Sequence, residues 1–292
     1  MVKRLSIAMA LMAAACGQSE QAAAPAAETA APAAPQLEEL WRVEGLAAPE
    51  SVAISQDGSF LYVTNVNGEG EARDGNGFIS RISMDGRILE REWARGFDAP
   101  KGIVRRDDAL YVADIDRLVV VDAATGAIRR RIALPGAGFA NDVALAPDRA
   151  ILVSDSANAR IYRVGENDAV TVWWENPLLQ AVNGIAVESG RLIVSTMAGR
   201  LLRLNYPSTE GAETIAEGIG DGDGIGVLGG GAYLVTEWPG RMFYVAPGRA
   251  LETILDTREQ GILLNDSLLA GSVLYQPNWA PGTLTAYRVI RP

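Results

Sequence analysis

Histidine is absent from this chain of 292 residues, and cysteine occurs once. Without an imidazole, the protein cannot contain a Ser-His-Asp triad, a Cys-His dyad or a histidine-ligated zinc site. With one cysteine, it cannot form an intramolecular disulfide. Any catalysis must therefore use carboxylates, amides, lysine or a metal-bound water.

Basic residues are outnumbered by acidic ones: the chain contains 26 Lys and Arg and 36 Asp and Glu, which gives a formal net charge of −10. An acidic balance argues against nucleic-acid binding and is compatible with cations. Hydrophobic residues make up 48% of the chain, which is sufficient for the core of one domain of this length. We expect a monomer with no nucleic-acid partner.

The first sixteen residues have the pattern of an export signal: two basic residues, an apolar stretch from Leu5 to Ala15, and then Cys16. The apolar stretch is shorter than the roughly 20 residues that span a bilayer. Cys16 resembles the lipid-modified cysteine of bacterial lipoproteins, although Ala13 replaces the usual leucine. This resemblance implies export and lipid anchoring at the outer membrane or in the periplasm, with no other membrane contact. The alternative is ordinary signal-peptidase cleavage, which would leave Cys16 as a free thiol.

Residues 17–36 are rich in alanine and proline and contain few large side chains. Pro25, Pro32 and Pro35 interrupt any helix that the alanines favour. Such a composition is typical of a flexible linker. We therefore predict one folded domain at residues 37–292.

The rest of the chain repeats a short pattern six times, in which a polar residue precedes a small or acidic one and then an apolar run. The leading residues are Glu50, Lys101, Asn141, Asn183, Asp223 and Asn265. Their spacings are 51, 40, 42, 40 and 42 residues. Each repeat contains short β-rich runs separated by turn residues. A period near forty with four such runs predicts an all-β six-bladed propeller with four-stranded blades.

The sixth repeat ends after its third strand, at the end of the chain. Residues 38–45 precede the first blade, and we predict that they supply the missing outer strand and close the ring. The first spacing is longer because of a glycine-rich and acidic insertion at 67–77. It does not match an EF-hand, so we interpret it as a mobile rim loop.

In a propeller, the six leading residues would surround one mouth of the central channel. Carboxylate and amide oxygens without His or Cys favour a hard cation such as calcium, for which Glu50, Asn141, Asn183 and Asp223 are the candidates. The alternative is that these side chains hydrate the channel and cap strand ends. The ends of the second strands are expected around the same rim, and Met197, Trp238 and Trp279 would make one side apolar. The candidate second-strand ends are Asn65, Asp114, Asp155, Thr196, Glu237 and Asn278.

Three segments resemble motifs of the senescence-marker-protein/gluconolactonase family: 137–155 around Asn141-Asp142, 177–196 around Asn183-Gly184, and 222–243 around Asp223-Gly224. The resemblance extends over most of residues 45–290. It implies a six-bladed propeller that holds a divalent ion, usually calcium. The family's ligands fall on Glu50, Asn141, Asn183 and Asp223, and its acid/base or nucleophilic aspartate falls on Asp223.

Phe139 replaces an arginine that sugar-lactone members use to bind substrate, which favours a less polar lactone or ester beside Trp238 and Trp279. Lys101 would bind a substrate carboxylate or a leaving alkoxide, or else pair with a neighbouring acid, and Asn265 is a further candidate for substrate binding. The resemblance implies a calcium-dependent hydrolase of lactones or esters in the cell envelope. The alternative is a non-enzymatic lipoprotein propeller that acts as a binding or scaffold module.

Overall fold

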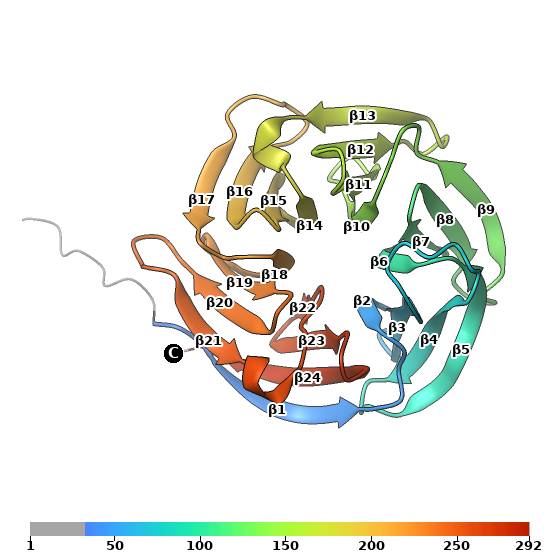
Figure 1. Ribbon diagram of the computed structural model, residues 1–292, viewed down its shortest axis with the longest axis horizontal. Helices are drawn as coiled ribbons and strands as arrows, with labels where there is room; N and C mark the ends of the chain where they lie inside the picture. Colours follow the sequence, from blue (N-terminus) through green and yellow to red (C-terminus); the bar gives the residue numbers. More distant parts are fainter. Residues whose placement is uncertain (1–32, 292) are drawn as a thin grey trace, which may run out of the picture. The chain divides into compact units, whose positions relative to one another are not determined.

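The computed structural model describes residues 33–291. The predicted signal, Cys16 and most of the linker lie outside the described residues. Six four-stranded antiparallel sheets surround a central channel, and the innermost strand of each sheet is the one that begins close to a polar lead (Figure 1). The predicted six-bladed propeller is therefore confirmed.

The strands follow the chain order, blade by blade. Blade 1 contains β2 (Pro49–Ile54), β3 (Phe60–Asn65), β4 (Gly77–Ser83) and β5 (Ile88–Phe97). Blade 2 contains β6 (Pro100–Arg106), β7 (Ala109–Asp114), β8 (Arg117–Asp122) and β9 (Ile128–Ala133), and blade 3 contains β10 (Ala140–Leu145), β11 (Ile151–Asp155), β12 (Arg160–Val164) and β13 (Val170–Glu175). Blade 4 contains β14 (Val182–Glu188), β15 (Arg191–Thr196), β16 (Arg200–Asn205) and β17 (Glu213–Glu217), and blade 5 contains β18 (Gly222–Gly229), β19 (Ala232–Glu237), β20 (Arg241–Val245) and β21 (Glu252–Asp256). Blade 6 contains β22 (Leu268–Ala270), β23 (Val273–Asn278), β24 (Thr283–Ile290) and, as its outer strand, β1 (Gln36–Val43).

The two ends of the domain close the ring together. β1 pairs antiparallel with β24 from Gln36 opposite Ile290 to Val43 opposite Leu284, so it runs along the outside of blade 6 (Figure 1). Trp41 also donates its indole N–H to the carbonyl oxygen of Met84 in blade 1, at 3.0 Å. The predicted closure by an N-terminal strand is confirmed, and it joins the first and last blades without a disulfide.

The core lies between neighbouring blades, because the middle strands are covered on both faces. β7, with the sequence ALYVAD, is buried at every position, as expected for strands that read as continuous apolar runs. Its Leu110 and Val112 pack toward blade 1, whereas Tyr111 and Ala113 pack toward blade 3. Burying one large apolar side chain contributes about 2 kcal/mol, so each interface stabilises the ring.

Blade 6 departs from the repeat at its inner strand. The sequence pattern places the start of that strand at Asn265, but β22 begins three residues later, at Leu268. Asn265 still contacts β23, because its backbone N–H donates to the carbonyl oxygen of Pro277 at 3.1 Å and Leu264 forms an isolated bridge with Asn278. Two 3-10 helices, Pro177–Leu179 and Arg258–Gln260, complete the elements, and no helix in residues 33–291 is long and apolar enough to cross a bilayer.

Candidate functional site

One cavity of about 340 Å³ opens at the mouth where the inner strands begin. All six leading residues line it, so the repeat brings together the side chains that the spacing predicts. The lining residues are Glu50, Gly70, Lys101, Phe139, Asn141, Asn183, Met197, Asp221, Asp223, Trp238, Asn265 and Trp279. Polar groups form its floor, and large apolar groups are part of its wall.

Four oxygens on this floor are buried without a hydrogen-bond partner: Glu50 Oε2, Asn141 Oδ1, Asn183 Oδ1 and Asp223 Oδ1. They belong to the four residues that the sequence nominates as metal ligands. A buried acceptor that lacks a donor costs about 1–3 kcal/mol, and here four such acceptors line one cavity. A cation that accepts oxygen ligands would satisfy them all.

The chemistry of this set fits calcium better than a transition metal. Calcium takes about 6–8 oxygen ligands, and two carboxylates would balance its charge while water completes the shell. Among the described residues, no group of three or more His, Cys, Asp or Glu side chains is placed to hold a metal. The candidate centre therefore depends on its two amides as well as on Glu50 and Asp223.

The two carboxylates of the set are costly to ionise without a cation. Burial, followed by the nearby charges of Asp223 and Asp266, raises the pKa of Glu50 well above its usual value. Burial and Asp266 also raise the pKa of Asp223, against a hydrogen bond from Asn183 that lowers it. Either protons or a bound cation must therefore compensate the charge at neutral pH.

A second acidic layer lies one residue further along the inner strands. Asp142 accepts hydrogen bonds from the backbone N–H groups of Val143, at 2.7 Å, and of Ile185 in the next blade, at 2.6 Å. Asp266 accepts from the hydroxyl of Ser51, at 2.5 Å. Burial raises the pKa of both carboxyl groups, that of Asp266 to about 6. These acids join neighbouring inner strands and add to the negative potential of the channel.

Lys101 is buried at 3% exposure and forms no ion pair with any described residue, so the predicted pairing with a neighbouring acid is wrong. Its ammonium donates to the carbonyl oxygens of Gly70, at 2.6 Å, and Ala99, at 3.3 Å. It also lies 4.3 Å from the centre of the Phe139 ring. Burial lowers the pKa of Lys101, and the charge of Glu50 opposes that effect.

The insertion between β3 and β4, residues 66–76, forms a strap that extends to blade 2 over the mouth. Its Gly70 lies beside Lys101, and a side chain there would also contact Phe139 and Trp279. Arg73 pairs with Asp116 of blade 2 at 2.9 Å. The strap therefore covers one side of the cavity.

The ends of the second strands do not line the cavity, contrary to expectation. They are buried, and several accept hydrogen bonds from the loops that lead into the inner strands. Asp114 accepts from the backbone N–H of Ala99 at 2.8 Å, and Asp155 accepts from that of Phe139 at 3.0 Å. Side chains alternate along a strand, so these residues face into the blade and position its neighbours.

The apolar wall lies where the sequence places it, with Met197, Trp238 and Trp279 in the cavity lining. Two further lining residues are Phe139, which the sequence analysis identified only through the family resemblance, and Asp221, which it did not identify. Each stands two residues before a leading residue of its blade. The same repeat, examined at that offset, could have identified both.

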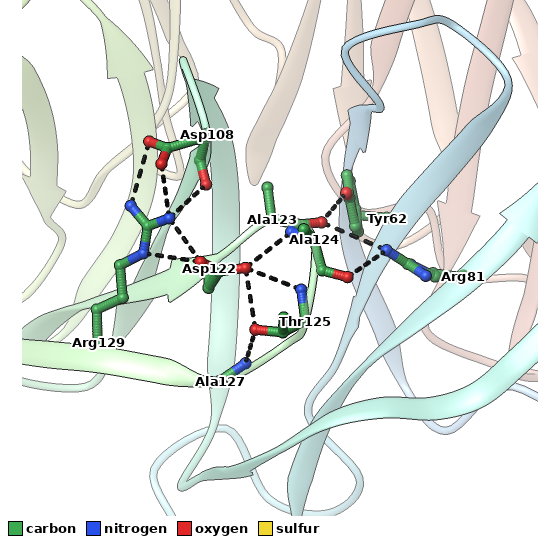
Figure 2. A network of polar contacts seen from close by, with 9 residues as sticks. All are labelled: Tyr62, Arg81, Asp108, Asp122, Ala123, Ala124, Thr125, Ala127 and Arg129. Atoms are coloured by element: carbon green, nitrogen blue, oxygen red, sulfur yellow. Dashed lines mark hydrogen bonds and ion pairs between the residues drawn. The ribbon is translucent and has the colours of Figure 1, made fainter.

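A larger hollow, of about 620 Å³, lies between blades 1 and 2 at the other end of the strands. Figure 2 shows the polar network beside it, in which Arg129 bridges Asp108 and Asp122 at 2.7 and 2.6 Å. Arg81 donates to the carbonyl oxygens of Ala123 and Ala124, each at 3.3 Å (Figure 2). We call this hollow the groove; three of its charged lining residues pair with charges beside it, Arg81 with Glu90, Asp107 with Arg149 and Asp108 with Arg129.

No family model and no curated protein matches the sequence. Among solved structures, the chain is similar to a catalytically inactive histidine-to-alanine variant of virginiamycin B lyase from Staphylococcus aureus in complex with quinupristin (16% identity, 88% of this chain and 99% of that one, TM-score 0.61). It is also similar to a protein assigned provisionally to the gluconolactonases (17% identity, 89% and 94%, TM-score 0.64). At such identities the likeness establishes the fold alone, which is a six-bladed propeller shared with lyase and gluconolactonase-like proteins.

Proposed function

We propose that this propeller is a calcium-dependent hydrolase of lactone or ester substrates, which it binds in the 340 Å³ cavity. The observation that carries the proposal is the set of four buried oxygens without partners, on Glu50, Asn141, Asn183 and Asp223. They lie at the floor of a cavity whose wall is apolar. This combination suits a carbonyl compound with a small polar centre and an apolar body.

A bound calcium ion would polarise the substrate carbonyl and stabilise the developing oxyanion. Asp223 lies in the cavity lining and is the proposed base or nucleophile. As a base, it takes a proton from water while the oxygen of that water bonds to the carbonyl carbon. The ester C–O bond then breaks, and the proton passes to the leaving oxygen.

The other lining residues are proposed to position the substrate. Trp238 and Trp279 would contact the apolar body of the substrate. Asn265 also lines the cavity, and its amide donates to the carbonyl oxygen of Pro49 at 2.8 Å. Two donors of Lys101 are used by Gly70 and Ala99. The third is available to a leaving alkoxide or a carboxylate product.

The lyase relatives suggest elimination as another reaction, but one observation argues against it. The variant with histidine replaced by alanine is described as catalytically inactive, and this chain contains no histidine. A reaction that requires that imidazole cannot proceed here with the same group. Hydrolysis with carboxylate chemistry needs no such residue.

The test is a pH-stat assay of the calcium-loaded protein against a panel of alkyl and aryl lactones and esters, with chelator-treated protein as the control. We expect acid release that is lost with chelation and restored by calcium. Equal rates with and without chelator would contradict calcium dependence. Release of no acid from any member, by a protein shown to bind calcium, would favour the non-enzymatic binding module.

A further inference from the structure

The positions two residues before the six leads form an upper ring. Their residues are Ala48, Ala99, Phe139, Ala181, Asp221 and Leu263. Five are apolar, so a single carboxylate occurs in this ring. Asp221 and Asp223 both line the cavity. Asp221 is partly exposed whereas Asp223 is 4% exposed, so Asp221 lies nearer to the open end.

The backbone at Asp221 is tightly constrained. The N–H of Gly222 donates to the carbonyl oxygen of Gly220 at 2.8 Å, which closes a three-residue turn around Asp221. Gly220 has φ +79°, and a side chain there would collide with the carboxylate of Glu237. The carbonyl oxygen of Asp221 accepts from the N–H of Trp238 at 3.0 Å. The turn thus fixes Asp221 beside Trp238.

The carboxylate of Asp221 has no hydrogen bond or ion pair with any residue in 33–291, although it is partly buried. Two other acids near this mouth are paired within the protein: Glu237 with Arg241, and Asp98 with Arg117. Because this carboxylate lines the cavity, a ligand bound there can reach it. The missing partner must be a hydrogen-bond donor, because an ionised carboxylate only accepts.

The surroundings of Asp221 favour a cationic donor. Trp238 beside it is 38% exposed, and an indole face attracts ammonium groups. Lys101, the cation of the floor, belongs to β6 in blade 2, which lies across the channel from β18 in blade 5 (Figure 1). The two charges therefore lie on opposite sides of the cavity, and repulsion from Lys101 is weakest near Asp221.

We propose that Asp221 is a specificity-determining residue that binds a primary ammonium group of the substrate, with the Trp238 indole packed beside it. The substrate would then be an amino-substituted lactone or ester. This statement of substrate class rests on the proposed hydrolase function. The ammonium site itself can be tested without turnover.

Calorimetric titration of the calcium-loaded full chain with 2-phenylethylamine and 2-phenylethanol compares an ammonium with a hydroxyl on one scaffold. We expect the amine to bind at least about tenfold more tightly, since charge-assisted hydrogen bonds are the stronger ones. Asp221→Asn should remove that preference. Glu217→Gln, at an exposed acid four residues earlier, should retain it. Equal affinity for both probes in the wild type, or an unchanged preference in Asp221→Asn, would overturn the proposal.

Trp238→Leu provides a second variant that leaves Asp221 in place, should Asp221→Asn fail to fold. It should weaken binding of the amine more than that of the alcohol, whereas an equal loss for both would overturn the pairing of acid and ring. Kinetics with phenylalanine methyl ester and methyl 3-phenylpropanoate then test the substrate class. We expect Asp221→Asn to raise KM for the amino ester alone. If neither ester is hydrolysed but the amine preference depends on Asp221, the hydrolase proposal fails and the ammonium site stands.

Discussion

The channel mouth and the groove between blades 1 and 2 are both hollow, but their polar groups differ. In the groove, Arg129 bridges two aspartates, and Arg81 stacks 4.2 Å from the centre of the Trp93 ring. Arg81 Nε is the one buried polar side-chain atom there, among the described residues, that lacks a hydrogen bond. At the mouth, four buried oxygens and the carboxylate of Asp221 lack partners.

This difference indicates function better than volume does. The groove is the larger hollow, at about 620 Å³ against 340 Å³, yet three of its five charged lining residues already form ion pairs within the protein. The mouth concentrates the groups that the fold leaves unsatisfied, as sites that bind ligands do. Four predictions test the contrast.

The largest effect is expected at Asp223. Asp223→Asn should lower kcat by at least about 100-fold, because it removes the proposed base or nucleophile. The melting temperature of the metal-free protein should not fall, since the substitution removes a buried charge. Steady-state kinetics and a thermal melt measure both. Asp122→Asn in the groove is the matched control and should retain wild-type turnover; wild-type turnover in Asp223→Asn would remove Asp223 from the mechanism.

The second effect concerns pH and Asp266. Its pKa is raised by burial to about 6, above the roughly 3.9 of an unfolded aspartate. The folded state then binds the extra proton, so the contribution of Asp266 to stability is greatest below about pH 4 and is lost as the pH rises through 6. Asp266→Asn should therefore raise the melting temperature of metal-free protein at pH 8 and not at pH 4.

Asp57 in the groove supplies a control of opposite sign. Hydrogen bonds from Ser55 and Ser59 lower the pKa of Asp57 to about 2. Its contribution is present above about pH 4 and is lost as the pH falls toward 2. Asp57→Asn should thus lower the melting temperature at pH 8, whereas the same direction of change in both variants would contradict the account.

A smaller effect is expected at Lys101. Lys101→Met removes the donor that binds the Gly70 carbonyl, so the strap should loosen and KM should rise several-fold with little change in calcium affinity. Hydrogen exchange over residues 66–76 and substrate kinetics would detect these changes. Unchanged KM for all substrates, with faster exchange in the strap, would assign Lys101 a purely structural role.

The smallest effect is expected in the groove itself. Arg129→Ala removes two exposed ion pairs, and such pairs contribute little to stability. We expect a slight decrease in melting temperature and unchanged calcium binding and turnover. A marked loss of either activity would show that the groove and the mouth are coupled, and the contrast would then fail.

The sequence was sufficient for the fold because each blade repeats its own pattern of polar lead, apolar run and turn. The same periodicity brought Glu50, Asn141, Asn183 and Asp223 to one cavity. Periodicity cannot describe what is unique to one blade. The loop that carries Gly70 over Lys101 depends on long-range contacts that the sequence pattern does not contain.

Blade 6 shows the same limit in another way. Its lead, Asn265, occupies the ring position and its backbone still bonds to Pro277 of β23, but β22 starts three residues later, at Leu268. The sequence analysis placed the ends of the second strands around the cavity, but the alternation of side chains along a strand turns these residues toward the neighbouring loops. Asp221 was missed for a different reason, since its signal becomes visible only when the six blades are aligned two residues before the lead.

The most direct test of the central claim is a calorimetric calcium titration of the metal-stripped protein, with Asp223→Ala in parallel. We predict one tight calcium site in the wild type and loss of that site in the variant, because four buried oxygens lack hydrogen-bond partners and can coordinate a cation. Absence of calcium binding by the wild type would contradict the account and leave a propeller with a hydrated channel.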